Sequence, residues 1–303
     1  MAISLQEDGV YAVHITRLPA ARPAVELHAF YPAEAASAAA PLAKLAKDLR
    51  ADRHQCSTVL KPGEYQLLSV DAPNVPRDEL RTAVRWRIKD MLDYSVDDAT
   101  LDVLDVPVDK NATARNHSMY AVAARNQLIQ QRQSLFEEAR IALSVIDIPE
   151  IAQRNIAALV EPEGRGIALL SFGPEGGLLT VTFSGELYLS RRLDVTLSQL
   201  LLADAEQANA LYDRITLEVQ RSLDHFDRQY HFITLSKLML CAPGDAGPGL
   251  RDYLAANLYI PVELLNLDSV LDFSKAPELK TPESQQRYFW ALGAALRHEE
   301  KAP

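Results

Sequence analysis

Three glycine-containing turns are the features of this sequence whose residue types and spacing could do chemistry. A turn of this kind exposes several backbone N–H groups, and glycine lets the chain approach a phosphate closely. Each turn follows an apolar stretch typical of a strand: Ser4-Leu5-Gln6-Glu7-Asp8-Gly9, Ser171-Phe172-Gly173-Pro174-Glu175-Gly176-Gly177 and Ala242-Pro243-Gly244. They could hold a nucleotide, or they could be plain connections between elements.

The first two turns carry residues that oppose phosphate binding. Glu7 and Asp8 put two carboxylates where a phosphate would lie, and like charges ~4 Å apart repel by ~4 kcal/mol at an effective dielectric constant of ~20. Pro174 has no N–H to offer. We therefore expect the first turn to be a charged hairpin and the second to bind phosphate poorly. The third could be a strand-to-helix turn or a close approach to a nucleoside.

Other catalytic and metal-binding patterns are weak. The sequence has no Gly-x-Ser-x-Gly, His-Glu-x-x-His or lysine-bearing P-loop motif. His225 and His231 are six residues apart, which does not place them on one helical face as metal ligands require. Cys56 and Cys241 lie in apolar surroundings and are expected to be reduced core thiols. We expect no catalytic residue and no metal site.

Composition and charge limit the class of protein. The chain has 303 residues, 48% of them hydrophobic, and a formal net charge of -10. Such a surface disfavours nucleic acid and anionic lipid as partners. No stretch approaches the ~20 apolar residues that span a bilayer, and the N-terminus carries Glu7 and Asp8 rather than the basic segment of a signal peptide. We expect a cytoplasmic protein without direct membrane insertion.

The order of the predicted elements repeats. Each half of the chain opens with three predicted strands and continues with alternating helices and strands; in the second half the strands are 167–172, 178–183 and 187–191. This order predicts a mixed sheet covered by helices in each half. Two such lobes with a cleft between them are the arrangement of the actin, hexokinase and Hsp70 superfamily, although other pairs of α/β units would also fit the pattern.

One predicted helix carries a basic stripe. Arg77, Arg81, Arg85 and Lys89 recur every four residues, and Trp86 lies beside them off the apolar face. The stripe could be a solvated face that pairs with neighbouring acids. It could also be a docking surface for an acidic partner, because arginine and aromatic side chains are frequent anchors of interfaces.

Four parts of the sequence resemble the PilM-type family of type IV pilus assembly proteins. They are 83–92 with 97–103, 120–125 with 146–149, 218–224, and 287–297. In order and spacing they extend over nearly the whole chain. The cytoplasmic lobe of the type II secretion protein GspL is a related possibility, although it normally continues into a membrane-spanning segment.

The resemblance implies an α/β, two-lobe actin-like fold with an inserted small α+β subdomain. The first lobe would comprise 1–73 and 145–160, the insertion 74–144 and the second lobe 161–281, with the C-terminal helix 282–303 packing back on the first lobe. PilM-type proteins are cytoplasmic scaffolds. They bind the N-terminal tail of a PilN-like inner-membrane protein, in a groove between the first lobe and the insertion, and couple the complex to the motor ATPase.

The resemblance also implies that the nucleotide site has degenerated. Where the family has an aspartate that organises Mg²⁺ ahead of each phosphate turn, this chain has Ser4 and Ser171. Gln6 replaces the first glycine of the first turn, and Ala242 and Pro243 replace the leading glycines of the third. We therefore expect no ATP hydrolysis and weak or absent binding of ATP and Mg²⁺. The alternative is a nucleotide-binding regulatory ATPase of the same machine.

Overall fold

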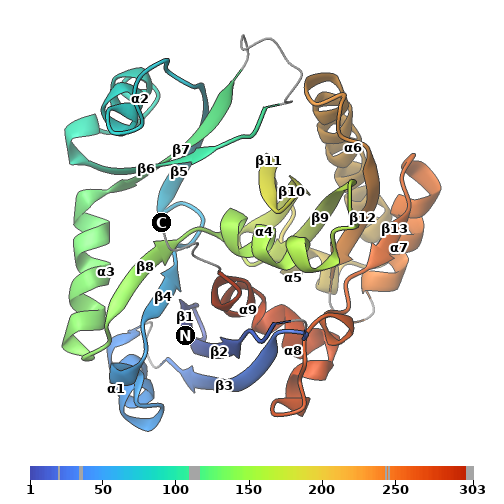
Figure 1. Cartoon of the computed structure of the whole chain (residues 1–303). Helices are drawn as coiled ribbons and strands as arrows, with labels where there is room; N and C mark the ends of the chain where they lie inside the picture. The colour runs from blue at the N-terminus through green and yellow to red at the C-terminus, as the bar shows by residue number, and fades with distance from the viewer. Residues whose placement is uncertain (20, 34–36, 109–116, 243, 245, 298–303) are drawn as a thin grey trace.

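Two five-stranded sheets with the same strand order form the two lobes (Figure 1). The computed structural model describes residues 1–19, 21–33, 37–108, 117–242, 244 and 246–297. The first-lobe sheet has the order β3-β2-β1-β4-β8 and the second-lobe sheet the order β11-β10-β9-β12-β13. In both, the first three strands along the chain are antiparallel and the last two run parallel to the first.

The strand bounds follow the apolar stretches of the sequence. They are β1 (Ala2–Leu5), β2 (Gly9–Thr16), β3 (Ala24–Pro32), β4 (Cys56–Val59) and β8 (Leu143–Asp147), then β9 (Gly166–Gly173), β10 (Gly176–Phe183), β11 (Glu186–Leu193), β12 (Leu235–Cys241) and β13 (Val262–Leu264). The central strands β1 and β9 are buried on both faces, so they read as nearly continuous apolar runs. The edge strand β3 is half-exposed and alternates apolar with polar residues.

A three-stranded sheet is inserted after β4. It comprises β5 (Tyr65–Asp71), β6 (Ala99–Asp105) and β7 (Ser118–Arg125) in the order β5-β7-β6. The small sheet therefore begins before the boundary at Asn74 that the sequence led us to expect. The reason is the turn at Gly63, whose φ of +85° directs the chain out of the first lobe directly after β4.

The two faces of the small sheet have different neighbours. Helix α2 (Leu80–Ile88) covers one face, where Val84 and Ile88 pack on Ala121 and Ala123. The other face carries Tyr65, Leu67, Tyr120 and Val122, which pack towards residues of both lobes, among them Ile151 and Leu187. Helix α3 (Asn126–Glu138) then returns to the first lobe, where Phe136 is fully buried.

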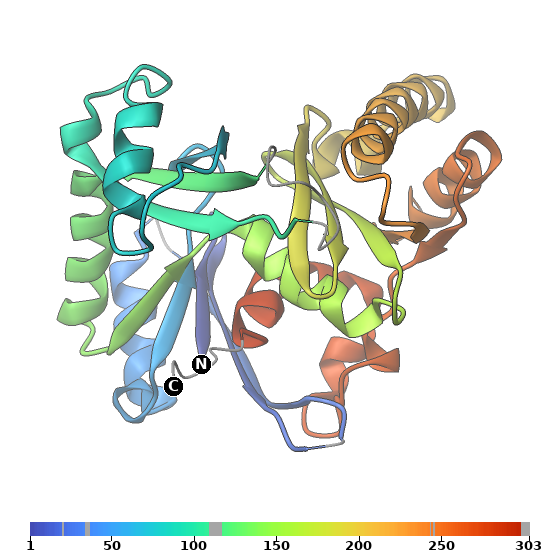
Figure 2. The ribbon, with the colours of Figure 1, turned by 45° about the horizontal axis from the view of Figure 1, so that its top comes forward.

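Helix α4 (Pro149–Val160) lies between the lobes, as Figure 2 shows. Proline at its first position suits a helix start, because the first N–H groups of a helix have no partner within it. Helix α9 (Phe289–Ala295) packs against α4 and against β1, β2 and β4. The approach is so close that a Cβ atom at Gly293 would lie 2.3 Å from the carbonyl oxygen of Ala152.

The remaining helices cover the outer faces of the lobes. They are α1 (Ala39–Asp48) in the first lobe, α5 (Leu197–Leu202), α6 (Ala205–Gln229) and α7 (Ala246–Asn257) in the second, and α8 (Pro282–Arg287) before α9. The sequence predicted one C-terminal helix; the structure breaks it into α8 and α9 at Tyr288. Among the described residues, none of these helices combines the length and apolar character needed to cross a membrane.

Candidate functional site

The first two predicted turns meet across the cleft between the lobes. Ser4, Gln6 and Glu7 of the β1–β2 turn line one pocket together with Gly173 and Gly176 of the β9–β10 turn. Lys61, Pro62, Pro149, Glu175, Arg192 and Trp290 also line it. The cavity measures about 60 Å³, which holds a few water molecules. The structure therefore brings residues of the first two turns together at one pocket.

The other predicted turn residues do not line this pocket. Asp8 is exposed at the tip of the first turn, whereas Ser171 and Gly177 are buried in the second-lobe sheet. Ala242 packs on the second-lobe core, and Gly244 adopts a φ of +57° in the third turn. Pro243 lies outside the described residues.

The first turn forms hydrogen bonds within itself and to the C-terminal segment. The N–H of Gln6 donates to the Gly9 carbonyl at 2.8 Å, and the Gln6 side chain donates to the Arg287 carbonyl at 3.0 Å. The Tyr11 hydroxyl donates to the Asp8 carboxylate at 2.6 Å, and burial together with this bond raises the pKa of Tyr11. A Cβ atom at Gly9 would lie 2.3 Å from the Tyr31 carbonyl oxygen. The turn thus packs tightly on β3 and on the C-terminal segment.

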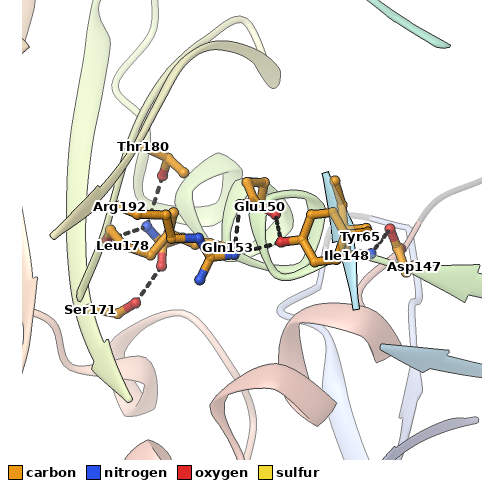
Figure 3. A network of polar contacts seen from close by, with 9 residues as sticks. All are labelled: Tyr65, Asp147, Ile148, Glu150, Gln153, Ser171, Leu178, Thr180 and Arg192. Carbon is orange, nitrogen blue, oxygen red and sulfur yellow. Dashed lines mark hydrogen bonds and ion pairs between the residues drawn. The ribbon is translucent and has the colours of Figure 1, made fainter. Parts of the chain in front are cut away.

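The serine of the second turn belongs to a buried network centred on Gln153 (Figure 3). The Ser171 hydroxyl donates to the Gln153 side-chain oxygen at 2.6 Å. The Gln153 amide nitrogen donates to the Leu169 carbonyl at 2.9 Å, the Leu178 carbonyl at 3.1 Å and the Thr180 hydroxyl at 2.9 Å. Gln153 is completely buried on α4. Ser171 therefore helps attach α4 to the second-lobe sheet. Ser4 is likewise buried, within β1.

Two buried carboxylates near the cleft are each paired with an arginine. Asp147, at the end of β8, accepts from the Ile148 N–H at 2.9 Å and forms an ion pair with Arg297 at 3.0 Å. Burial raises the pKa of the Asp147 carboxyl, and Arg297 opposes this rise. Glu150, on the first turn of α4, forms an ion pair with Arg192 at 2.7 Å. In the part of the chain that the structure describes, no group of three acidic, histidine or cysteine residues could hold a metal ion.

The Glu150 ion pair joins three parts of the molecule. Glu150 belongs to α4, Arg192 to β11 of the second lobe and Tyr65 to β5 of the small sheet. The Tyr65 hydroxyl donates to Glu150 through a short hydrogen bond and accepts one from Arg192 at 2.5 Å. Burial and the Glu150 charge raise the pKa of Tyr65. Burial alone would lower the pKa of Arg192, but the Glu150 charge outweighs it and the pKa of Arg192 is raised. No local pattern predicts this junction, because Tyr65, Glu150 and Arg192 are far apart in the chain.

A larger hollow of about 570 Å³ lies between the small sheet and the second lobe; we call it the β11 groove. Tyr65, Leu67, Ser69 and Tyr120 line it from the small sheet. Residues 188–192 of β11 line it from the second lobe, together with His225, Gln229 and Tyr230 at the end of α6. The sequence did not predict this groove either, because no local pattern marks a surface assembled from several distant segments.

The basic stripe on α2 is not part of either hollow. Arg81 pairs with Asp102 at 2.8 Å and Arg85 with Asp97 at 3.4 Å, both on the small subdomain itself. The ammonium group of Lys89 lies 5.8 Å from the centre of the Trp86 ring, which is 68% exposed. The ion pairs favour a solvated face at Arg81 and Arg85, whereas Trp86 and Lys89 remain available at the surface.

The comparisons with known proteins support the fold. No family model matches the sequence, and no curated protein sequence matches it. The structure is similar to the PilM-PilN type IV pilus biogenesis complex, with a TM-score of 0.72 and 21% identity over 97% of this chain and 96% of that chain.

Two other solved structures are more distantly similar. One is the cytoplasmic domain of EpsL, an inner-membrane component of the Vibrio cholerae type II secretion system (TM-score 0.46, 14% identity, 87% of this chain and 84% of that one). The other is a Bacteroides thetaiotaomicron protein with an actin-like ATPase fold and unknown function (TM-score 0.49, 10% identity, 92% and 94%). The chain has a two-lobe actin-like α/β fold, which confirms the fold class predicted from its sequence.

Replacing Gln153 with leucine should destabilise the protein strongly. The leucine cannot bond to the two carbonyls and two hydroxyls that the amide joins, so these buried groups lose their partner; we expect a loss of about 2–4 kcal/mol in the free energy of unfolding. Urea denaturation followed by circular dichroism measures it. The matched variant Gln130→Leu, at an exposed position of α3, should stay within about 0.5 kcal/mol of the parent. Equal stability of the two variants would contradict the role given to Gln153.

Replacing Arg192 with methionine should also destabilise the fold. Glu150 would remain buried without its cation, which costs about 3–5 kcal/mol. The double variant Glu150→Gln/Arg192→Met removes both charges and should recover much of that loss. The same urea titration tests this. A double variant no more stable than Arg192→Met would show that the ion pair is not what joins the three parts.

Proposed function

We propose that this chain is a PilM-type scaffold of a type IV pilus biogenesis machine and binds the N-terminal tail of a PilN-like inner-membrane protein. The supporting observation is the similarity to the PilM-PilN complex, which extends over nearly the whole of both chains. At 21% sequence identity, this similarity shows a shared fold and does not by itself show a shared function. The sequence segments that resemble PilM-type proteins, which also extend over most of the chain, lead from the fold to the function.

We further propose that the chain does not hydrolyse ATP. Mg²⁺ in phosphate-transferring sites is held by carboxylates, and serines occupy the two positions where the resemblance implies aspartates. One of them, Ser171, is bonded to Gln153. Glu7 and Glu175 line the cleft and would repel a triphosphate. Lys61 and Arg192 line it too, which keeps a nucleotide-binding regulatory ATPase as the second candidate.

A narrower assignment is part of the proposal. Within the PilM-type family we propose an MshI-type protein of the mannose-sensitive haemagglutinin (MSHA) pilus, on the basis of the sequence alone. It would act on the cytoplasmic side of the inner membrane, held there by its PilN-like partner, and contact the motor ATPase. A GspL-like lobe of a type II secretion system is the alternative.

Capture of the tail tests the scaffold role. The full chain carries an affinity tag and is co-expressed with the PilN-like inner-membrane protein of the same organism, either complete or without its N-terminal tail. We expect co-purification only when the tail is present, because an extended tail can bond to a strand edge and fill side-chain pockets. Equal recovery of the tail-less protein, or recovery of neither, would refute the proposed partner.

The α2 surface is proposed as the contact for an acidic face of the motor ATPase. The exposed Trp86 and Lys89 lie beside Arg81 and Arg85 there. The variant Trp86→Ala/Lys89→Glu should reduce co-purification of the motor ATPase severalfold, because it removes the exposed ring and reverses the charge beside it. Recovery of the PilN-like protein serves as the control and should not change. Undiminished recovery of the ATPase would mean that the stripe is only a solvated face.

Nucleotide binding is tested by thermal unfolding and calorimetry. A ligand at 100 times its Kd stabilises the folded state by ~2.7 kcal/mol, which is several degrees in Tm for a domain of ordinary size. We expect millimolar MgATP to move the midpoint by less than about 1 °C and no release of phosphate over hours. A nucleotide-binding PilM protein is the positive control. A tight, Mg²⁺-dependent complex would favour the regulatory ATPase instead.

A further inference from the structure

The first half of α6 exposes its outer face on the outside of the second lobe (Figure 1). Buried side chains on this helix begin at Ile215, and none of the side chains of 206–214 is fully buried. In that half, Leu211 and Tyr212 pack on the second-lobe core. A helix in a protein is stabilised mainly by the packing of its faces. The opposite face of this half is therefore available for a further contact.

A groove runs along this exposed face between α5 and α6. It measures about 590 Å³, and we call it the α5–α6 groove. Leu202, Ala203, Ala210 and Leu211 line it together with uncharged polar residues and Arg214, and none of its lining residues is acidic. Leu202 is 83% exposed, and Leu217, three residues beyond Arg214 on α6, is 46% exposed. Exposed leucines beside a concave surface are typical of a contact with another protein chain.

Two opposite charges lie symmetrically about Ala210. Glu206 is four residues before it and Arg214 four residues after it, so the three share one face of α6. Glu206 forms no ion pair with a described residue. Arg214 pairs with the exposed Asp194 at 2.8 Å, and a guanidinium group has enough N–H donors for a second carboxylate. A second α6 that crossed antiparallel at Ala210 would bring Glu206 of each copy level with Arg214 of the other.

The same antiparallel crossing matches the apolar residues. Leu217 is seven residues after Ala210 and Ala203 seven residues before it. The crossing therefore places Leu217 of one copy over Ala203 of the other, beside the exposed Leu202. The small side chain of Ala210 lets the two helix axes approach to ~8 Å. Contacts that repeat reciprocally in this way are what a two-fold dimer requires.

The other carboxylates near this face are engaged within their own copy. Asp213, at the margin of the face, accepts a hydrogen bond from the Tyr253 hydroxyl of α7 at 2.6 Å. Asp204 is the N-cap of α6, and Glu218 pairs with Arg221 at 3.3 Å. Two copies of a chain with a net charge of -10 repel each other in general. A face on which opposite charges meet is therefore favourable for their association.

We propose that two copies of this chain associate as a two-fold dimer through the α5–α6 groove, with the two α6 helices antiparallel across Ala210. The inference concerns the purified chain alone and does not depend on the proposed function. A single helix pair is a small interface, so the association is reversible, with a Kd of about 10–100 µM. Figure 1 places α2 and α6 on opposite sides of the molecule, so the dimer leaves the α2 surface accessible.

Charge reversal tests the pairing, with sedimentation equilibrium of the full chain as the measurement. We expect Glu206→Arg and Arg214→Glu each to raise the Kd of the dimer about tenfold, because like charges then meet twice across the two-fold axis. Both reversals in one chain recreate the opposite-charge pairs and should return the Kd to within about threefold of the parent. Glu137→Arg makes the same charge change at an exposed position of α3 and should leave the Kd within about twofold.

A cysteine at the crossing point tests the register of the two helices. The natural Cys56 and Cys241 are both free and buried, so an introduced surface cysteine reacts selectively. Ala210→Cys would face its counterpart across the two-fold axis, within the reach of a disulfide bond. Asn209→Cys lies about 100° around the helix and points away. On mild oxidation we expect Ala210→Cys to form about tenfold more covalent dimer than Asn209→Cys, as measured by non-reducing electrophoresis.

Each other outcome contradicts the inference. A parent chain that stays monomeric well above the expected Kd would overturn it, and a dimer indifferent to both single reversals would place the interface elsewhere. Weakening by the single reversals without recovery in the double variant would refute the antiparallel pairing, as would equal cross-linking of the two cysteine variants. Circular dichroism checks that each variant is folded, and if a reversal variant is not, the cysteine pair decides.

Discussion

The burial of α4 between the two lobes is the constraint on which the rest of the structure depends. A buried helix must satisfy the polar side chains it brings into the core, because an unpaired polar group there costs ~1–3 kcal/mol, whereas a formed hydrogen bond contributes only ~0.5–1.5 kcal/mol. Gln153 meets this condition by bonding to the backbone and side chains of the second-lobe sheet. On the other side of α4, the absence of a side chain at Gly293 lets α9 pack closely. Side chains of α4 thus bond it to the second-lobe sheet, and α9 packs on its other side.

This arrangement changes what the cleft between the lobes can do. In a nucleotide-dependent two-lobe protein the ligand's phosphates and metal bridge the lobes. Here Arg192 of the second lobe reaches Glu150 of α4 and Tyr65 of the small sheet. That charge-assisted ion pair links α4, β11 and the small sheet across the cleft.

The sequence predicted the strands and turns, because these depend on a local pattern of residues. Apolar runs such as Ile167–Leu170 revealed the buried central strands, and the turns after β1 and β9 were correctly expected to end strands. It could not predict the Gln153 network or the Glu150–Arg192 pair, since a glutamine or arginine in a helix or strand looks the same whether it faces solvent or core. The break at Tyr288 and the early start of the small sheet at Tyr65 were missed for the same reason: tertiary packing decides them.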